Sequence, residues 1–495
     1  MNNKSYVKKI VYCSFSFSLM ILMFQSCRNE ACTYTSIPSC TNQETGGFMI
    51  ATKASDPNAS PINQVATLYK TLHNAVAPVG NNWNDPTAAP NRVQAIQPLG
   101  WVSNKIGEVF GIALDHNNGI YLSATDVYHF DYLQNFPYNP GIGDASGIGS
   151  AGAAGIYYTN YNTINTTTSL VTTLNSSNAN TVGTNQIPST GFSTSVGNSI
   201  GNIAFDFENN QLFATNLEDG KIYRIDPTSG KVKSTLDPFN SDSGMAGISP
   251  VGDQLWGIGV YTNMGITKVY FARTTLPHVS NSLAPGGVEI WSVALDSNGE
   301  FVATPGSSIG NFTATIASGL IKKEISLTTG TQTKVTDIAF SNSGRMLVAE
   351  RGNAHASGIF EFVNSGGTWS SGNNFYLGGD LSFSNPIYLK GRNSAGGVDY
   401  SDREVGSSFV TDDIVWGTGN YMPTILLNGG YPNYVYGAQG MSSSGNNSNV
   451  SINKTNDLYI DYNCTGWPHL YNIPSGGKSS DKNKVGDIEF FDQCR

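Results

Sequence analysis

The sequence feature that most constrains the fold is a short strand-and-turn unit that recurs along the chain. Residues 201–232 read GNIAFDFENNQLFATNLEDGKIYRIDPTSGKV, in which apolar runs alternate with turns rich in Asn, Asp, Ser and Gly. The β-branched and aromatic runs are typical of strands, and the Asn and Gly turns tolerate the positive φ angles of tight hairpins. Similar units begin at Gly111, Ser292 and Asp337. The pattern therefore predicts an antiparallel meander that is repeated several times.

Weaker copies extend this series. In AGISPVGDQLWGIGV, Gln254 aligns with Gln211, and the segments GGVDY and YGAQG align around Gly397 and Gly437. The aligned strands recur at intervals of about 40–60 residues, and repeats of about 40–50 residues with four strands each indicate a β-propeller. One longer interval, near residues 111–202, leaves room for an inserted loop or a further blade. We expect an all-β β-propeller of six to seven four-stranded blades, with a β-sandwich array as the alternative.

Composition agrees with one large all-β domain. The chain has 495 residues, of which 55 are Gly and 13% are charged. We expect a propeller domain over residues 62–495, including an N-terminal lead-in, long loops and closure by the terminal segments. Within the lead-in, apolar spacing over residues 65–76 predicts a single helix. We do not expect nucleic acid as a partner, because the formal net charge is −9 and the sequence has no basic patch.

The blade units resemble those of the NHL and SMP-30/gluconolactonase-like propellers, a superfamily that includes streptogramin lyase. The resemblance rests on residues 201–232 and their copies and covers roughly residues 97–491. It implies a propeller fold more strongly than any one activity, because the matching residues belong to turns and core. In SMP-30-like enzymes, Glu, Asn and Asp side chains from different blades hold a divalent cation in the central channel, where it activates water.

Polar residues on the aligned first strands are the candidate site. Asn202 and Asp337 both precede the sequence IAF, so they should face one end of the channel, and Asp399 lies close to the same position. We expect these residues to bind ligand. Glu108 and Glu289 are weaker candidates for a metal, because strand alternation points them away from the axis. We therefore expect no cofactor, with Ca²⁺ or another divalent cation as the alternative.

Other polar clusters receive a structural interpretation. The sequences DHNNG at 115–119 and DSNG at 296–299 faintly resemble calcium loops but lack the further acidic ligands that such loops need. We interpret both as turns between strands. Glu350, Arg351 and His355 form a compact cluster, which we interpret as a surface salt bridge in a loop.

The N-terminal sequence predicts export. Residues 1–26 combine lysines with an apolar stretch that is short and interrupted by Ser, as in a signal peptide. FQSC resembles a bacterial lipobox with Cys27 as the acylated residue, although Gln25 and Phe24 depart from the usual pattern. We expect a lipid-anchored tether over residues 27–61 and an outer-membrane or cell-surface lipoprotein. A secreted or periplasmic protein is the alternative.

The remaining cysteines lie near the chain ends. Cys32, Cys40, Cys464 and Cys494 predict two disulfides in an oxidising compartment. Two pairings stay open: bonds that join the two terminal segments, or Cys32–Cys40 together with Cys464–Cys494. Metal binding by these cysteines is not expected, because no CxxC spacing is present.

Two function classes fit these observations. None of the usual hydrolase, metalloprotease or nucleotide-binding motifs occurs. We therefore favour a binding module for a glycan, a peptide or a surface protein, with membrane contact only through the lipid anchor. The alternative is a divalent-metal-dependent hydrolase or lyase of the SMP-30-like kind, so whether the chain is an enzyme stays open.

Overall fold

A computed structural model gives the fold of most of the strand-rich part of the chain. The expected signal peptide, the expected acylation site Cys27 and the four cysteines expected to form disulfides lie outside the described residues. The described residues are 48–53, 64–70, 95–96, 98–125, 151–164, 167–174, 200–217, 220–238, 253–275, 287–302, 311–313, 321–328, 333–352, 356–377, 391–405, 408–423, 434–445, 457–459 and 485–491.

Within these residues the strands form six sheets, which we call blades 1 to 6, and the four main strands of each blade pair antiparallel. In blade 1, β25 (Val485–Phe491) is followed outward by β1 (Phe48–Lys53), β2 (Ala66–Lys70) and β3 (Ala95–Ile96). Blade 2 contains β4 (Val109–Leu114), β5 (Gly119–Ala124), β6 (Gly155–Asn160) and β7 (Ser169–Thr173). Blade 3 contains β8 (Ile200–Asp206), β9 (Gln211–Asn216), β10 (Lys221–Ile225) and β11 (Val232–Asp237), with the short β15 (Asn311–Thr313) parallel to β11.

The other three blades follow the same order from inside to outside. Blade 4 contains β12 (Asp253–Asn263), β13 (Ile266–Thr275), β14 (Gly287–Ala294) and β16 (Ile321–Thr328). Blade 5 contains β17 (Lys334–Phe340), β18 (Arg345–Arg351), β19 (Ile359–Ser365) and β20 (Thr368–Phe375). Blade 6 contains β21 (Ser394–Val405), β22 (Ser408–Pro423), β23 (Tyr434–Ser442) and β24 (Asp457–Tyr459). One short helix, α2 (Ser103–Ile106), precedes β4.

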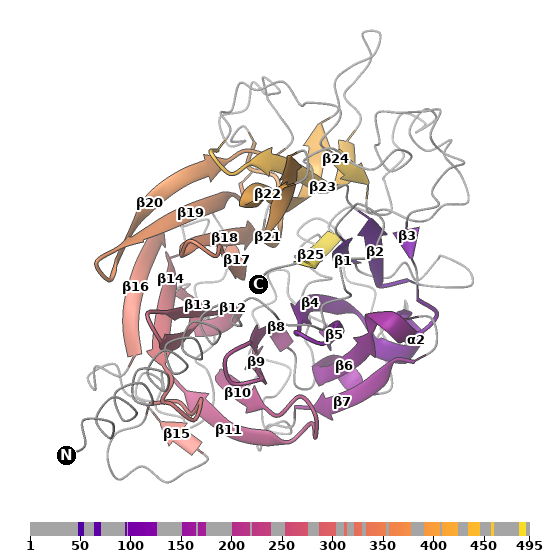
Figure 1. Cartoon of the computed structure of the whole chain (residues 1–495), viewed down its shortest axis with the longest axis vertical. Helices are drawn as coiled ribbons and strands as arrows, with labels where there is room; N and C mark the ends of the chain where they lie inside the picture. The colour runs from indigo at the N-terminus through magenta and orange to yellow at the C-terminus, as the bar shows by residue number, and fades with distance from the viewer. Residues whose placement is uncertain are drawn as a thin grey trace, which may run out of the picture.

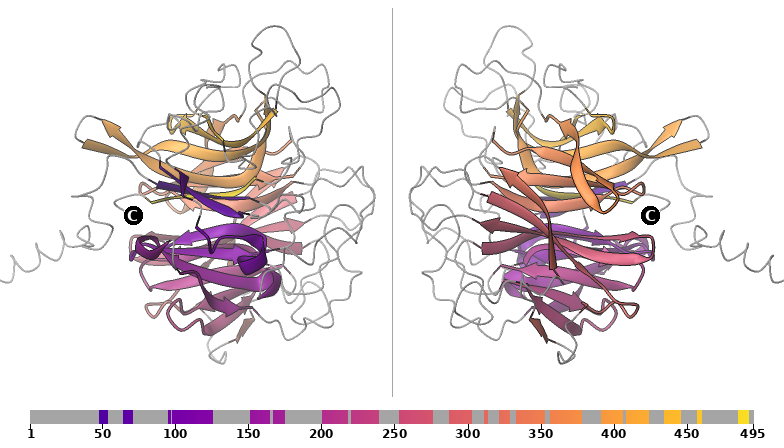
Figure 2. Two further views of the ribbon diagram at one scale, coloured as in Figure 1. Left: turned by 90° about the vertical axis from the view of Figure 1, so that its right-hand side faces the viewer. Right: turned by 90° about the vertical axis from the view of Figure 1, so that its left-hand side faces the viewer.

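The six blades surround a common centre, and the strand named first above for each blade is the innermost (Figure 1). Strands β4, β8, β12, β17, β21 and β25 contact one another in sequence, and β25 contacts β4, so the ring of inner strands is closed. The side views show the blades packed face to face around this axis (Figure 2). The protein is therefore a six-bladed β-propeller in the described part of the chain, and blade 1 combines strands from both ends of that part.

Apolar side chains fill the spaces between neighbouring blades. Side chains alternate across each strand, so every blade buries one set against the blade before it and another against the blade after it. Phe213 of blade 3 and Phe271 of blade 4 share one such cluster, and Trp416 of blade 6 shares another with Phe490 of blade 1. Removing this surface from water is the main favourable contribution to the stability of the ring.

The blade boundaries differ from those expected from the repeats. Ser292 lies on β14 and Gly437 on β23, which are third strands rather than first strands. Gln254 lies on β12, the innermost strand of blade 4, and not on a second strand. The reason is that one strand–turn–strand pattern describes every hairpin of a blade, so hairpins of the first and third strands look alike in the sequence.

Two expectations near the N-terminus are also corrected. Residues 66–70, placed in the expected helix, form β2, in which Tyr69 pairs with Met49 of β1. Sheet pairing thus overrides the local helical spacing. Because β1 begins at Phe48, the propeller also includes part of the expected tether at 27–61. None of the described helices is long and apolar enough to cross a membrane.

Candidate functional site: an axial pocket above a polar layer

Each innermost strand of the propeller is interrupted by an irregularity in its pairing with the second strand. The register shifts lie between Val109 and Ile112 in blade 2 and between Ile200 and Ile203 in blade 3, and equivalent shifts occur in the other four blades. A β-bulge releases backbone N–H groups from the ladder. These buried groups need other partners.

One residue within this irregularity or at its end alternates between glycine and a polar residue around the ring. Each is followed by Ile or Val, as in Asn202–Ile203 and Asp337–Ile338. We call the three polar members, Asn202, Asp337 and Asp487, the polar layer. In ring order from blade 2 to blade 1 the residues are Gly111, Asn202, Gly257, Asp337, Gly397 and Asp487.

Each member of the polar layer first accepts a hydrogen bond from the next N–H of its own strand. Asn202 Oδ1 accepts from Ile203 N at 2.7 Å, and Asp337 Oδ1 accepts from Ile338 N at 2.8 Å. Asp487 Oδ1 accepts in the same way from the following residue at 3.0 Å. The side chains therefore satisfy the inner strands on which they lie.

The aspartates of the layer also bind the next blade. Asp337 Oδ2 accepts from Val398 N of blade 6 at 2.8 Å, and Asp487 Oδ2 accepts from Ile112 N of blade 2 at 3.1 Å. Asn202 Nδ2 instead donates to Asp337 Oδ1 at 3.3 Å, from blade 3 to blade 5. The polar layer thus joins blades that are not neighbours in the sequence.

The intervening glycines allow this close approach. A Cβ atom on Gly257 would lie 2.8 Å from the backbone nitrogen of Asp337. A Cβ atom on Gly397 would lie 2.7 Å from the Cα atom of Asp487. Only glycine fits at these positions, because a larger residue would push the neighbouring inner strand away.

Burial changes the protonation of the two aspartates. Removal from water raises the pKa of Asp337 to about 7, and the charge of Asp399 adds to this. Burial, followed by the charge of Asp337 and a hydrogen bond to it, raises the pKa of Asp487 well above its ordinary value. This hydrogen bond lowers the pKa of Asp337 and raises that of Asp487, so Asp487 is the partner that keeps the proton. The pair shares one proton at the axis.

A pocket of about 320 Å³ opens on the axis, at the C-terminal ends of the inner strands. We call it the axial pocket. Its base is formed by Ile112, Ile203, Ile258 and Ile338, each of which directly follows the residue at the alternating glycine and polar position. Asn202, Asp337 and Asp487 do not themselves line it.

The pocket exists because the second residue after the alternating position is small in four blades. Glu489 of blade 1 is the exception among the strands that line the pocket. Its side chain is half-buried there, two residues beyond Asp487. The four small lining residues are Ala113, Ala204, Gly259 and Ala339.

Aromatic rings surround the opening of the pocket. His116 and Phe207 lie with ring centroids 4.5 Å apart, and Tyr261 and Phe340 are stacked at 5.0 Å. Phe491 of blade 1 also lines the pocket. All five side chains are half-buried, so each leaves part of its surface available for contact.

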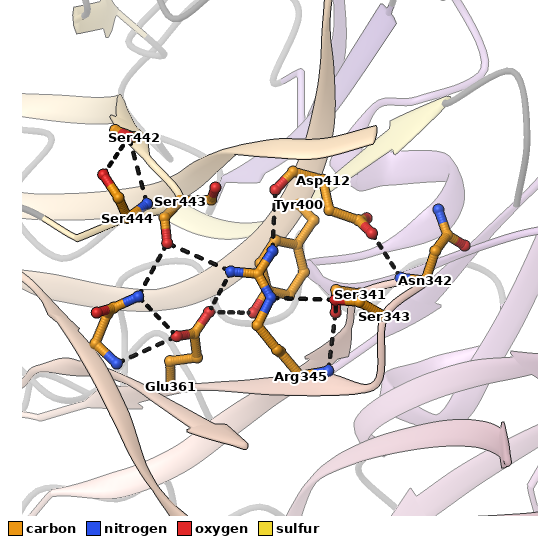
Figure 3. A network of polar contacts seen from close by, with 11 residues as sticks. Ser341, Asn342, Ser343, Arg345, Glu361, Tyr400, Asp412, Ser442, Ser443 and Ser444 are labelled. Atoms are coloured by element: carbon orange, nitrogen blue, oxygen red, sulfur yellow. Dashed lines mark hydrogen bonds and ion pairs between the residues drawn. The ribbon is translucent and has the colours of Figure 1, made fainter. Parts of the chain in front are cut away.

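A hydrogen-bond network between blades 5 and 6 holds one side of the rim (Figure 3). The rim residue Asn342 donates its N–H to Asp412 Oδ2 of blade 6 at 2.7 Å. Arg345 donates to Glu361 Oε1 at 3.0 Å, and Tyr400 of blade 6 donates to the same oxygen at 2.9 Å. Burial and then the charge of Glu361 raise the pKa of Tyr400, which keeps its hydroxyl a donor. The rim turn is therefore fixed by the neighbouring blade.

Two acidic residues of the rim are engaged in turns. Asp115 Oδ1 accepts from Asn117 N and Gly119 N, both at 2.7 Å. Asp206 accepts from the N–H groups of the turn that follows β8 and from the Gln211 side chain. The sequence DSNG behaves in the same way at Asp296. The interpretation of these segments as turns is confirmed.

The carboxylates predicted to hold a cation do not converge. Glu289 lies on β14, the third strand of blade 4, where it pairs with Lys323 at 3.1 Å and accepts from the Trp291 indole at 2.9 Å. Glu108 directly precedes β4 and does not line the pocket. No group of three or more His, Cys, Asp or Glu side chains suited to a metal occurs among the described residues.

The three buried aspartates near the axis have the same arrangement as one another. Asp399, the third predicted ligand-binding residue, accepts from Tyr400 N at 2.8 Å and from Phe490 N of blade 1 at 2.9 Å. Each aspartate therefore accepts one N–H of its own strand and one of the next blade. The carboxylate oxygens of these aspartates already accept backbone hydrogen bonds, so they do not fit the channel metal that the family resemblance implies.

The cluster near residue 350 is buried rather than exposed. Glu350 accepts from Gly358 N at 2.8 Å, and its burial raises its pKa to about 7. Arg351 donates to the carbonyl of Val485 on β25 at 2.6 Å. Arg351 thus joins blade 5 to blade 1, the hydrogen bond from Gly358 to Glu350 lies within blade 5, and the two residues do not form a surface salt bridge. His355 lies outside the described residues.

Sequence reasoning missed Asp487 and Glu489. The segment GDIEFF repeats the pattern of TDIAF at Asp337, and this signal is sufficient to align both. It was missed because the last inner strand completes the blade begun by β1 to β3 and therefore has no second strand following it in the sequence.

Comparisons with known proteins add little beyond the fold. No family model and no curated protein matches the sequence. Similar solved structures include a nidogen/laminin complex (TM-score 0.38, 9% identity, covering 90% of this chain and 98% of that chain). A gluconolactonase from Xanthomonas campestris gives a TM-score of 0.32 with 10% identity, covering 69% of this chain and 76% of that chain. A PL25 ulvan lyase gives 0.33 with 10% identity over 69% and 68%. These neighbours include both enzymes and binding proteins.

Proposed function

We propose that the protein is a binding module whose ligand enters the axial pocket. The observation that carries this proposal is a pocket with partly exposed aromatic rings around its opening, above a layer whose carboxylates are held by backbone N–H groups. Concave sites with apolar walls and a few polar groups are the usual form of small-ligand sites. The ligand would be a glycan, a peptide or a segment of a surface protein.

Filling the pocket tests this proposal. Ala204 is half-buried and lines the pocket, so Ala204→Leu should occupy space that the ligand needs. Glycan and peptide arrays would be probed with the parent protein and with this variant, and Val363→Ala, an exposed change on β19, would be the control. Compounds that bind the parent and the control but not Ala204→Leu support the proposal. Binding that is equal in all three proteins contradicts it.

The alternative is a metal-dependent hydrolase or lyase acting in the channel. It would need carboxylates that can turn toward a cation. Asp337, Asp399 and Asp487 each accept two backbone hydrogen bonds, and freeing them would leave buried N–H groups without partners, at about 1–3 kcal/mol each. This cost favours the binding function, and we propose that the protein acts without a resident metal.

We further propose that the module works outside the cytoplasm. The proposal rests on the signal-like residues 1–26 and on Cys27 in its lipobox-like context. It places the propeller at the outer membrane or cell surface as a lipoprotein, with the secreted or periplasmic form as the alternative. Cys32, Cys40, Cys464 and Cys494 would then form two disulfides near the chain ends.

A further inference from the structure

We infer that the axial pocket takes a small organic ammonium ion. This inference rests on the proposed binding function and names the chemical class of its ligand. The pocket combines three properties that such an ion needs: a net negative lining, aromatic side chains at its opening and a small volume.

The charge of the lining is of one sign. Asp115, Asp206, Glu208 and Glu489 line the pocket, and no Lys or Arg is among the lining residues in the described part of the chain. Asp115 and Asp206 keep their turns in place, and Glu489 lies at a position where the other lining strands carry Ala or Gly. A cationic group between these walls gains electrostatic energy that a neutral group of the same shape does not.

The aromatic rings provide the second part of the recognition. An ammonium group over an aromatic face is attracted to the negative face of the ring. Rings approach the opening from separate sides of the ring of blades: Phe207 beside His116 from blades 3 and 2, and Phe340 stacked on Tyr261 from blades 5 and 4. A ligand at the centre can therefore contact rings from both sides within a lining that carries four acidic residues.

Size narrows the class further. A volume of about 320 Å³ lies at the lower end of the range for small-molecule sites, about 300–1,000 Å³. Long or branched oligomers would have to extend out of the opening. The inference is therefore a free small molecule with one ammonium group.

Paired probes of equal shape test the charge requirement. Choline and 3,3-dimethylbutan-1-ol differ in one atom, the quaternary nitrogen, and hence in charge. Calorimetric titration of the full mature protein should give choline an affinity about tenfold or more above that of the alcohol, as one cation–π contact plus one charge contact would produce. The choline affinity should also decrease as salt is added, while the alcohol affinity should not.

Two variants connect the binding to the pocket. Glu489→Gln keeps the shape and removes the charge, so it should weaken choline by about fivefold or more and leave the alcohol unchanged. Ala204→Leu should abolish the binding of both probes. Asp413→Asn removes a carboxylate that does not line the pocket and pairs with Arg403, so its affinities should equal those of the parent. Melting temperatures verify that each variant is folded.

The remaining outcomes are decisive. If both probes bind equally and Ala204→Leu removes both, the pocket binds ligand without a charge preference, so this inference fails and the proposed function stands. If neither probe binds, while an array glycan or peptide binds the parent and not Ala204→Leu, this inference fails and the proposed function stands. If choline binds equally well to Ala204→Leu, its site lies elsewhere and the inference is overturned.

Discussion

At the residue scale, the shared proton between Asp337 and Asp487 is the most sensitive feature of the structure. Both carboxyls are buried at the axis, and each accepts an N–H from its own strand and from the next blade. Two charges at such a distance are unfavourable, so one carboxyl stays protonated. Asn202 occupies the equivalent position in blade 3, where its amide permanently donates the hydrogen bond that a protonated aspartate would donate.

This equivalence predicts how stability depends on pH. Burial raises the pKa of Asp337 to about 7 and raises that of Asp487 well above its ordinary value, and the unfolded value is about 3.9. The folded state therefore binds more protons than the unfolded state. The contribution of these two carboxyls to the stability of the fold is fully present below about pH 4 and is lost as the pH rises through 7. Asp487→Asn should be destabilising at pH 5, because an amide nitrogen cannot accept the hydrogen bond that Ile112 N donates to Asp487 Oδ2. This loss should become smaller at pH 8, as measured by the melting temperature.

Glu350→Gln is the matched control for this experiment. Its carboxyl also has a pKa raised by burial to about 7 but lies outside the polar layer. It should remove a separate part of the pH dependence, additive with that of Asp487→Asn. A parent protein that is equally stable at pH 5 and pH 8, or an Asp487→Asn variant whose loss of stability is at least as large at pH 8 as at pH 5, would contradict the shared proton.

At the element scale, the inner strands alternate between a polar residue and a glycine at one position around the ring. The alternation lets Asp337 and Asp487 reach across to the backbone of the next inner strand, which approaches closely at glycine. Part of this was predictable: the sequences NIAF and DIAF aligned Asn202 with Asp337, and their convergence is confirmed by the 3.3 Å contact. The strand order of blade 4 was not predicted, because hairpins of the first and third strands share one local pattern. Asp487 was not predicted, because no second strand follows β25 in the sequence.

A single added methyl group tests the alternation. In Gly257→Ala the new Cβ would lie 2.8 Å from Asp337 N and 2.9 Å from the carbonyl carbon of Thr336, and this overpacking should destabilise the fold by about 1–3 kcal/mol. Gly366→Asn is the control, since Gly366 has open surroundings and a φ of 61° that Asn tolerates. Urea denaturation measures both, and equal stability of the two variants would show that inner strands do not require glycine here.

At the scale of the whole molecule, one strand completes the ring. β25 is the innermost strand of blade 1 and pairs with β1, for example Ala51 with Ile488. Thr52 of β1 accepts from Asp487 N and donates to the Phe110 carbonyl of blade 2, both at 2.8 Å. The same strand carries Asp487 for the polar layer and Glu489 for the pocket, so closure of the ring and formation of the site depend on one segment.

The location of the molecule is tested by removing its expected anchor. Cys27→Ala deletes the acylation site but no residue of the described propeller. The variant should move from the membrane fraction to the soluble fraction with an unchanged melting temperature, because lipid chains supply the membrane affinity. Fractionation of cells that express the parent and the variant measures this. A variant that stays as membrane-bound as the parent would contradict lipid anchoring.

The account's central claim is that the axis holds a structural polar layer below a binding pocket, and not a metal centre. Elemental analysis of the purified mature protein, before and after treatment with a chelator, tests it most directly. The account predicts no divalent metal at a stoichiometric level, and ligand binding that chelation leaves unchanged. A stoichiometric divalent ion that only the chelator removes, and that is lost in Asp337→Asn, would contradict it.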